Sequence, residues 1–589
     1  MRTNRFYKWM VCVAAVALVL TSCKRYLEVE PISSFGADYV FDNVVNAQKA
    51  VLGAYSPLTG DNGYGIRISM YYPYDEDNMM GQGGTPYPDN ERRDIAHYTA
   101  TPSNTQLAAP FNQLYAGIER ANICIYNIPK MDAYTNGSES DKKELKRLVG
   151  EVLTLRAQYY LELIRNWGDV PAQFQPSSLE SDLFKPKTDR DSIYSKLIED
   201  LAMASTLLPW RTEVTSDERI TQGAARALRA RIALYRGGYA LRRNKQMARG
   251  ADFKTYYQIA KDECAAIMAR PEQHKLNSSY QSVFKDYICA HRAEPNGEVI
   301  WEIAMGGGTS ALGDSKLGYY NGPRWNNLGN SALTILPNYF YMFDSTDTRR
   351  DVTVVAYNIN QNGTFVGKTL QTLVDGKFRR DWITNPVALT SSAQYFGLNW
   401  PIIRFSDVLL MFAEADNELS NGPTAAAKTA FEQVRLRAYG GNAALIGTTP
   451  STYAGFFDAI VKERALEFGS EGIRKYDLIR WNLLDQKIAQ TKLLLAIMAA
   501  RNTAPWNTYP ATMYFRTNQT SLQWAGSFYA PTVTPAPSGF TSVAWLGSGI
   551  TSTILTYYAI GFKTGKSELL PIPQASIDAN PRLTQDYGY

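Results

Sequence analysis

The sequence predicts a mainly α fold, in which long amphipathic helices pack in pairs and are interrupted by irregular loops and short β segments. The block 402–481 gives the strongest evidence. Its first half repeats apolar residues at steps of three and four: Phe405, Val408, Leu409, Phe412, Ala415 and Leu419. A second helical pattern in the block reads IVKERALEFGSEGIRKYDLIRW. One such pair cannot bury its apolar faces alone, so we expect it to stack against similar pairs elsewhere in the chain.

Local signals predict the ends of several elements. The triplet Asn421-Gly422-Pro423 is a helix stop, and a glycine pair at 440–441 closes the pattern AAAKTAFEQVRLRAY. An earlier long helix is expected to end at Gly168, shortly before Pro171. We also expect helices at 191–208, 220–239 and 253–268, and a strand at 298–304.

The first 22 residues have the pattern of a bacterial secretion signal. Arg2, Arg5 and Lys8 make a positive start, an apolar run follows at 11–20, and Leu-Thr-Ser then precedes Cys23. Small residues before a cysteine are typical of a lipoprotein cleavage site, where the cysteine becomes the acylated N-terminus. We therefore expect residues 1–22 to be a signal peptide. Lipidated Cys23 would anchor the chain to a membrane without spanning it.

Composition narrows the classes of function. The 589-residue chain has a net charge of +5, and loss of the three basic leader residues leaves 58 basic and 56 acidic residues. That balance gives no electrostatic footprint for nucleic acid. Cys124, Cys264 and Cys289 are widely spaced and odd in number, so we expect buried thiols and no metal site. The 38 tyrosines and 11 tryptophans leave a surplus of rings for a binding surface.

Blocks from both halves of the chain resemble the SusD/RagB family of nutrient-binding lipoproteins. Besides the two patterns in 402–481, they are ELKRLVGEVLTLRAQYYLELIRNWGDVP, the element Asp347-x-Arg349 and the terminal LLPIPQASIDANPRLTQDYGY. The resemblance implies a SusD-like stack of tetratricopeptide-type helix pairs. It also implies an N-terminal helical region at 23–300 and a C-terminal SusD/RagB region at 301–589.

The same resemblance implies a function. A member of this family would be lipid-anchored on the bacterial outer membrane and exposed at the cell surface. There it would capture oligosaccharide and deliver it to a SusC-like TonB-dependent transporter. Such a role needs no cofactor and no catalytic residue. Relatives such as RagB leave a peptide cargo open as the alternative.

Two aromatic loops contain the candidate ligand-binding residues. Apolar periodicity stops in residues 59–110, a long irregular excursion rich in Gly, Tyr, Asp and Asn. Its candidates are Tyr71, Tyr72, Tyr74, Asp75 and Asn78. The second loop contributes Tyr319, Tyr320, Trp325 and Asn327. Flat rings stack on the apolar faces of sugars, while amide and carboxylate neighbours bind the hydroxyls. Alternatively, these rings cover the helical stack or contact a partner.

A surface glycoside hydrolase is the less favoured alternative. Glu463 and Glu467 lie one helical turn apart, near the separation of about 5–5.5 Å between the two carboxyls of retaining glycosidases. Because the same helix supplies Lys462 and Arg464, a structural ion-pair network is favoured. Scattered histidines argue against zinc or a Ser-His pair.

Three further charged residues and one acidic run receive structural interpretations. We expect Arg404, Asp407 and Glu414 to belong to the scaffold. The acidic run 75–78 lacks the spacing of an EF-hand calcium loop, so we expect a solvated turn there.

Overall fold

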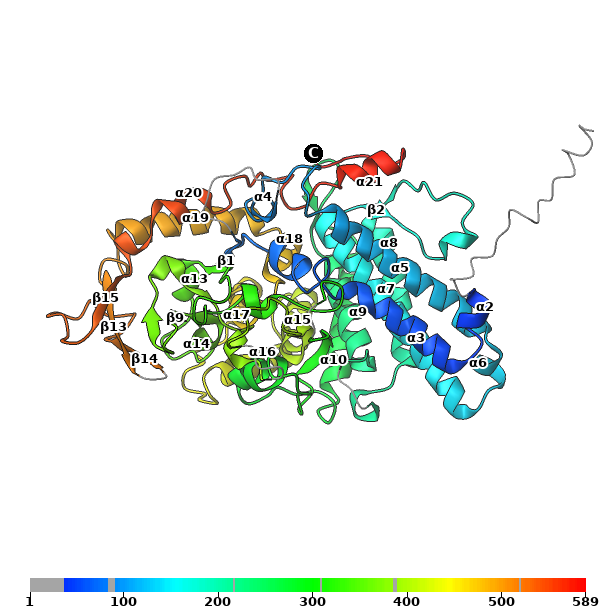
Figure 1. Ribbon diagram of the computed structural model, residues 1–589, viewed down its shortest axis with the longest axis horizontal. Helices are drawn as coiled ribbons and strands as arrows, with labels where there is room; N and C mark the ends of the chain where they lie inside the picture. Colours follow the sequence, from blue (N-terminus) through cyan, green and yellow to red (C-terminus); the bar gives the residue numbers. More distant parts are fainter. Residues whose placement is uncertain (1–35, 83–90, 215–217, 308–309, 385–388, 519–520) are drawn as a thin grey trace, which may run out of the picture.

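The computed structural model describes residues 36–82, 91–214, 218–307, 310–384, 389–518 and 521–589. Within these ranges the fold is mainly α, as predicted (Figure 1). None of the helices described there is long and apolar enough to cross a membrane. The leader and Cys23 lie outside the described residues, so cleavage and lipidation stay predictions.

The long helices form one continuous stack (Figure 1). They are α3 (Val44–Tyr55), α5 (Ala108–Asn127), α7 (Glu139–Trp167), α8 (Arg190–Leu207), α9 (Gln222–Gly237), α10 (Phe253–Met268), α15 (Phe405–Ser420), α16 (Ala425–Ala438), α17 (Tyr453–Phe468), α18 (Arg474–Arg480) and α19 (Leu484–Ala500). Each packs against the next from α5 to α10, and α10 then packs against α15. Helices from both sides of residue 300 therefore share one hydrophobic core.

Capping residues explain where the helices begin and end. The Ser138 side chain accepts from the backbone N–H of Asp141 at 3.1 Å and starts α7, which ends at Gly168 with φ +79°. Asn421 takes a left-handed φ of +52° and ends α15. The Gly441 N–H donates to the Leu436 carbonyl at 2.8 Å after α16. The predicted helix ends at these three positions are confirmed.

Short helical turns join the long helices. The α-helical ones are α2 (Ala37–Val40), α4 (Arg92–Ala96), α6 (Asp132–Asn136), α11 (Tyr280–Ser282), α12 (Leu317–Tyr320), α13 (Pro337–Phe340), α14 (Arg350–Thr353), α20 (Ser552–Tyr557) and α21 (Gln574–Ala579). The others are 3₁₀ or π turns: Ser56–Leu58, Arg67–Tyr71, Ile128–Lys130, Ser177–Leu179, Arg211–Glu213, Val283–Ile288, Leu370–Thr372, Arg380–Trp382 and Gly547–Gly549.

The β segments are short and join parts of the chain that are distant in sequence. They are β1 (Met79–Met80), β2 (Val170–Pro171), β3 (Lys187–Thr188), β4 (Ala240–Leu241), β5 (Met247–Ala248), β6 (Val299–Ile303), β7 (Thr334–Ile335), β8 (Val354–Val355), β9 (Tyr357–Ile359), β10 (Phe365–Gly367), β11 (Val374–Asp375), β12 (Trp400–Arg404), β13 (Thr512–Asn518), β14 (Ser521–Ala525) and β15 (Thr541–Ala544). The strand expected at 298–304 is β6, which pairs antiparallel with β12. A four-stranded sheet has the order β1-β7-β11-β8, so it ties the first aromatic loop to the second half of the chain.

One C-terminal region contains elements that the sequence analysis did not assign. Helices α19 and α20 have no predicted counterpart. The same region forms the sheet β14-β13-β15, at the end of the molecule opposite α2 (Figure 1). Helix α19 contributes Leu484, Ile488 and Leu495 to a smaller hydrophobic cluster, which also contains Leu478 and Trp481. The spacing of four and seven residues is typical of a helix.

Buried His274 predicts a pH dependence of stability. Its ring packs under α9 beside Gly223, and burial lowers its pKa to about 4, despite the hydrogen bond with the Gly297 carbonyl at 2.8 Å. Between the pKa of about 4 in the folded chain and about 6.5 in the unfolded chain, the unfolded state binds more protons. The free energy of unfolding should therefore fall as the pH falls from 6.5 to 4. Urea titrations should show a shallower fall in His274→Gln, and an equal fall would contradict the assignment.

Candidate functional site

The second aromatic loop is partly exposed, and we call its residues 317–331 the ring-bearing segment. Tyr319 and Tyr320 end α12 with their ring centroids 5.1 Å apart and their planes at 83°. Their carbonyls accept from the N–H groups of Asn330 and Ala332, each at 2.7 Å. Both rings are half-buried. The segment thus leaves the core and returns to it beside the same two tyrosines, and it holds their rings at the surface.

Trp325 and Asn327 lie on the tight turn at the tip of this segment. The backbones of Trp325 and Leu328 exchange two hydrogen bonds, of 3.1 and 2.8 Å. The two residues between them, Asn326 and Asn327, have φ of +53° and +62°, a conformation that Asn tolerates better than most residues. The Asn326 N–H also donates to the carbonyl of Ile359 in β9 at 2.6 Å. Trp325 is half-buried and Asn327 is exposed.

The first aromatic loop lies in the core, which corrects the expectation of a second exposed surface. Its candidates are almost fully buried: Tyr71, Tyr72, Tyr74, Asp75 and Asn78. The Tyr72 ring meets Trp167 edge-on at 5.7 Å. The acidic run is no solvated turn either, because the Asp75 carboxylate accepts from the N–H groups of Gly81 and Ala559 and contacts His97. These rings cover the helical stack, the alternative that the sequence left open.

Tyr71 is the part of the first loop that lies beside the ring-bearing segment. Burial raises its pKa to about 12, and the neighbouring Tyr320 adds to this shift, whereas Arg92 opposes it. Two side chains that the sequence did not single out complete this junction. The Gln82 amide donates to Asn330 Oδ1 at 2.9 Å, and Arg92 donates in turn to Gln82.

A second polar group borders the segment at its start. Lys316 Nζ lies 2.9 Å from Asp61 Oδ2, and the Tyr395 hydroxyl donates to the same oxygen at 3.1 Å. The ammonium also lies 4.7 Å from the centre of the Tyr395 ring. Sequence reasoning missed these three residues because they come from distant irregular stretches without a motif. Only the fold brings them together.

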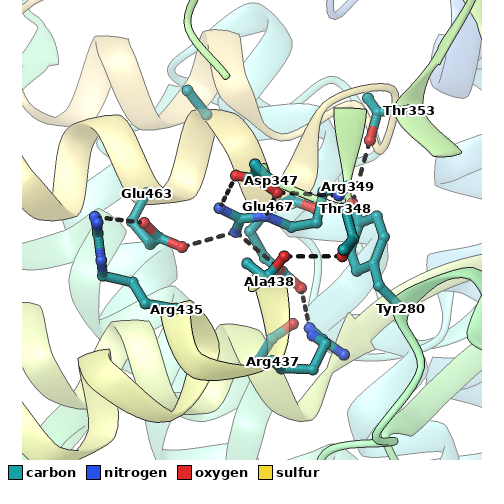
Figure 2. A network of polar contacts seen from close by, with 12 residues as sticks. Tyr280, Asp347, Thr348, Arg349, Thr353, Arg435, Arg437, Ala438, Glu463 and Glu467 are labelled. Carbon is teal, nitrogen blue, oxygen red and sulfur yellow. Dashed lines mark hydrogen bonds and ion pairs between the residues drawn. The ribbon is translucent and has the colours of Figure 1, made fainter. Parts of the chain in front are cut away.

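Glu463 and Glu467 belong to a buried ion-pair network, as predicted (Figure 2). Arg349 Nη1 donates to Glu463 Oε1 at 2.7 Å and lies 3.2 Å from Glu467 Oε2. Glu467 also accepts from Arg437 at 2.5 Å and from Arg404 at 2.9 Å. Burial favours the neutral form of Glu467, but these arginines outweigh it and lower its pKa to about 2. This network joins the Asp347-x-Arg349 element to β12, α16 and α17.

The other expected scaffold residues are equally buried and paired. Asp407 accepts from Arg464 at 2.5 Å and from Arg231 at 2.6 Å, and these two arginines outweigh its burial and lower its pKa. Glu414 binds Arg480 and accepts from the Trp481 indole at 2.9 Å. A carboxylate held by buried arginines is poorly placed to act as a proton donor or nucleophile on an external molecule.

The described cysteines are buried free thiols, as expected. Burial raises the pKa of Cys124 and of Cys289 to about 12, so neither thiolate forms near neutral pH. In the described part of the chain, no three His, Cys, Asp or Glu side chains gather in a way that could hold a metal ion.

Comparisons with known proteins match both halves of the chain to one family. The model described as "SusD family" matches residues 297–589, and the model described as "Starch-binding associating with outer membrane" matches residues 26–234. SusD-like protein P25 of Formosa agariphila is 25% identical over 510 residues, which cover 79% of this chain and 88% of P25. A SusD-like protein of Bacteroides ovatus is 22% identical over 80% of this chain and 82% of its own.

Solved structures agree on the fold. A SusD homologue from Bacteroides thetaiotaomicron has a TM-score of 0.75 at 21% identity and covers 94% of this chain and 98% of its own. The structure titled "Laminarin binding SusD-like protein" has a TM-score of 0.65 at 20% identity and covers 93% and 100%. Surface glycan-binding protein A from B. thetaiotaomicron, in complex with laminarihexaose, has a TM-score of 0.64 at 20% identity and covers 92% and 99%. The fold and both family models thus agree: the chain belongs to the SusD family.

Proposed function

We propose that this protein binds an oligosaccharide at the ring-bearing segment and neither cleaves nor modifies it. The observation that carries the proposal is the group of half-buried rings, Tyr319, Tyr320 and Trp325, held at the surface by backbone hydrogen bonds. Because the backbone is held and the two tyrosine rings pack partly against the core, little conformational entropy is lost when a sugar stacks there. Exposed Asn327 adds an amide donor and acceptor for sugar hydroxyls.

The cations around the rings can contribute hydrogen-bond donors to a polar ligand. Lys316 is already paired with Asp61, so its charge is compensated before any ligand arrives, whereas Arg92 donates to the neutral amide of Gln82 and keeps its charge. Hydroxyl groups can still accept from such cations at the rim. The names of relatives that bind laminarin and laminarihexaose support a glycan of this kind.

The proposed role includes delivery of the captured oligosaccharide to a transporter. A lipidated Cys23 would hold the protein at the outer membrane, in line with the description of the family model that matches residues 26–234. A SusC-like TonB-dependent transporter would receive the captured oligosaccharide. The stack of long helices offers a rigid body for such a partner.

The experiment is calorimetric titration of the chain that starts after Cys23, with a panel of plant, host and microbial oligosaccharides, including laminarihexaose, and of peptides. Binding to one glycan class supports the proposal. Binding to peptides alone would leave the family assignment unchanged but would contradict an oligosaccharide as the ligand. No binding to any of them would contradict a ligand site that is complete in the isolated protein.

A polysaccharide assay tests whether the protein breaks bonds. We expect no release of reducing sugar, because Glu463 and Glu467 are held by buried arginines. The matched variant is Glu463→Gln, measured on the same substrates. Sugar release that follows the purified chain and disappears in this variant would overturn the binding-only proposal.

A further inference from the structure

Asp375 lies directly beneath the ring-bearing segment and makes an unusual set of contacts. It ends β11 and is fully buried. Its carboxylate accepts from the Asn321 side-chain amide at 3.0 Å and from the Gly322 N–H at 3.3 Å. Both donors belong to the segment, at the point where it leaves α12. Gly322 has φ of +75°, so the chain turns sharply at the residue that Asp375 holds.

This carboxylate differs from most buried carboxylates of the described chain, which pair with cations. Examples are Asp77 with Arg474, Asp407 with Arg464 and Glu414 with Arg480. Asp375 instead relies on two neutral N–H donors, although an unpaired buried charge is costly. Its neighbours in the sheet, Thr334–Ile335 and Val354–Val355, contain no titratable group. Arg379 acts on it electrostatically, and Asp375 and the Tyr74 phenol also interact.

We propose that Asp375 is a positioning residue for the candidate ligand surface: it fixes the course of the ring-bearing segment and so the placement of Trp325 relative to the Tyr319–Tyr320 pair. The inference rests on the proposed function and deepens it, because it assigns the control of that site. The carboxylate itself touches no ligand. Its effect passes through Asn321 and Gly322.

The contact between Asp375 and the ring-bearing segment should depend on pH. The ionised carboxylate offers an acceptor oxygen to each donor, whereas the neutral acid has a hydroxyl on one side that faces an N–H group. Burial raises the pKa of Asp375 to about 7, even though the Gly322 and Asn321 donors lower it. The contact should therefore be intact at pH 8 and weakened at pH 6. The segment loosens as the pH falls.

Hydrogen exchange of the whole mature chain tests this without any ligand. We expect protection of the amides in 317–331, normalised for the intrinsic exchange rate, to fall at least threefold from pH 8 to pH 6. The Asp375→Asn side chain is neutral at every pH. At both pH 8 and pH 6, protection of the same amides in this variant should therefore equal the wild-type protection at pH 6. Asp351→Asn, an exposed residue whose partner is Arg350, should behave as the wild type. Equal protection of the wild-type segment at both pH values would overturn the inference.

A substitute variant and a glycan titration complete the experiment. If Asp375→Asn does not fold, Asn321→Ala replaces it, because this change removes one of the two donors and should halve the pH effect or more. Titration of the oligosaccharide panel into the same samples separates the two proposals. A pH-dependent segment that binds no glycan would refute the proposed function and leave the positioning role standing. Glycan affinity that is equal at pH 6 and pH 8, with unchanged protection, would refute the positioning role alone.

Discussion

Glu467→Gln is expected to lower the free energy of unfolding by about 3–5 kcal/mol, the cost of breaking a buried ion pair from one side. The amide keeps the shape of the side chain but removes the charge that Arg349, Arg404 and Arg437 share. All three guanidinium groups are buried, so water cannot replace the lost partner. Urea titration followed by circular dichroism measures the change.

The pair between Asp182 and Arg582 provides the matched control. Its N–O distance of 2.7 Å is as short as those of the network, but the side chains are 43% and 57% exposed. Asp182→Asn should cost less than about 1 kcal/mol, because water screens an exposed pair. Equal losses in both variants would mean that burial does not set the strength of this network, contrary to its interpretation as the central scaffold.

Tyr72→Ala is expected to cost about 3–5 kcal/mol, as other aromatic deletions in protein cores do. Tyr72 is fully buried against Trp167, and its hydroxyl donates to the Gln106 carbonyl at 2.9 Å. The folded fraction should still bind glycan with an affinity within threefold of the wild type, because the ring lies in the core.

Tyr72→Phe distinguishes the contribution of the ring from that of the hydroxyl. It removes one hydrogen bond and should cost about 0.5–1.5 kcal/mol. The same titrations with urea and with glycan apply to both variants. If Tyr72→Ala had wild-type stability but no longer bound glycan, the result would contradict the core placement of Tyr72. It would instead support the sequence-based prediction that the first loop is a binding surface.

The sequence predicts the helical stack well because its signals are local. Apolar periodicity defined α15 and α17, and stop signals at Gly168 and Asn421 placed two helix ends correctly. The element Asp347-x-Arg349 was identified by resemblance, and the structure explains it, since Arg349 is the centre of the buried network (Figure 2).

The candidate site was only partly predictable, because composition does not encode burial. The segment around Tyr72 and Tyr74 is similar in composition to the segment around Tyr319 and Tyr320. The first nevertheless lies in the core, whereas the second is partly exposed at the surface. Contacts between distant segments decide the difference. Asp375 carries no sequence signal at all, since its role depends on pairing of β11 with β7 and β8.

The most direct test of the binding role is calorimetric titration of wild-type chain and Trp325→Ala, side by side, with the glycan that the panel identifies. Aromatic rings are enriched among the hot spots of binding surfaces, and loss of a hot-spot side chain costs about 2 kcal/mol or more. We therefore expect Trp325→Ala to bind more than tenfold more weakly while its unfolding curve stays unchanged, because the ring is half-buried at the tip of a turn. Unchanged affinity in a folded Trp325→Ala chain would contradict the ring-bearing segment as the site of capture.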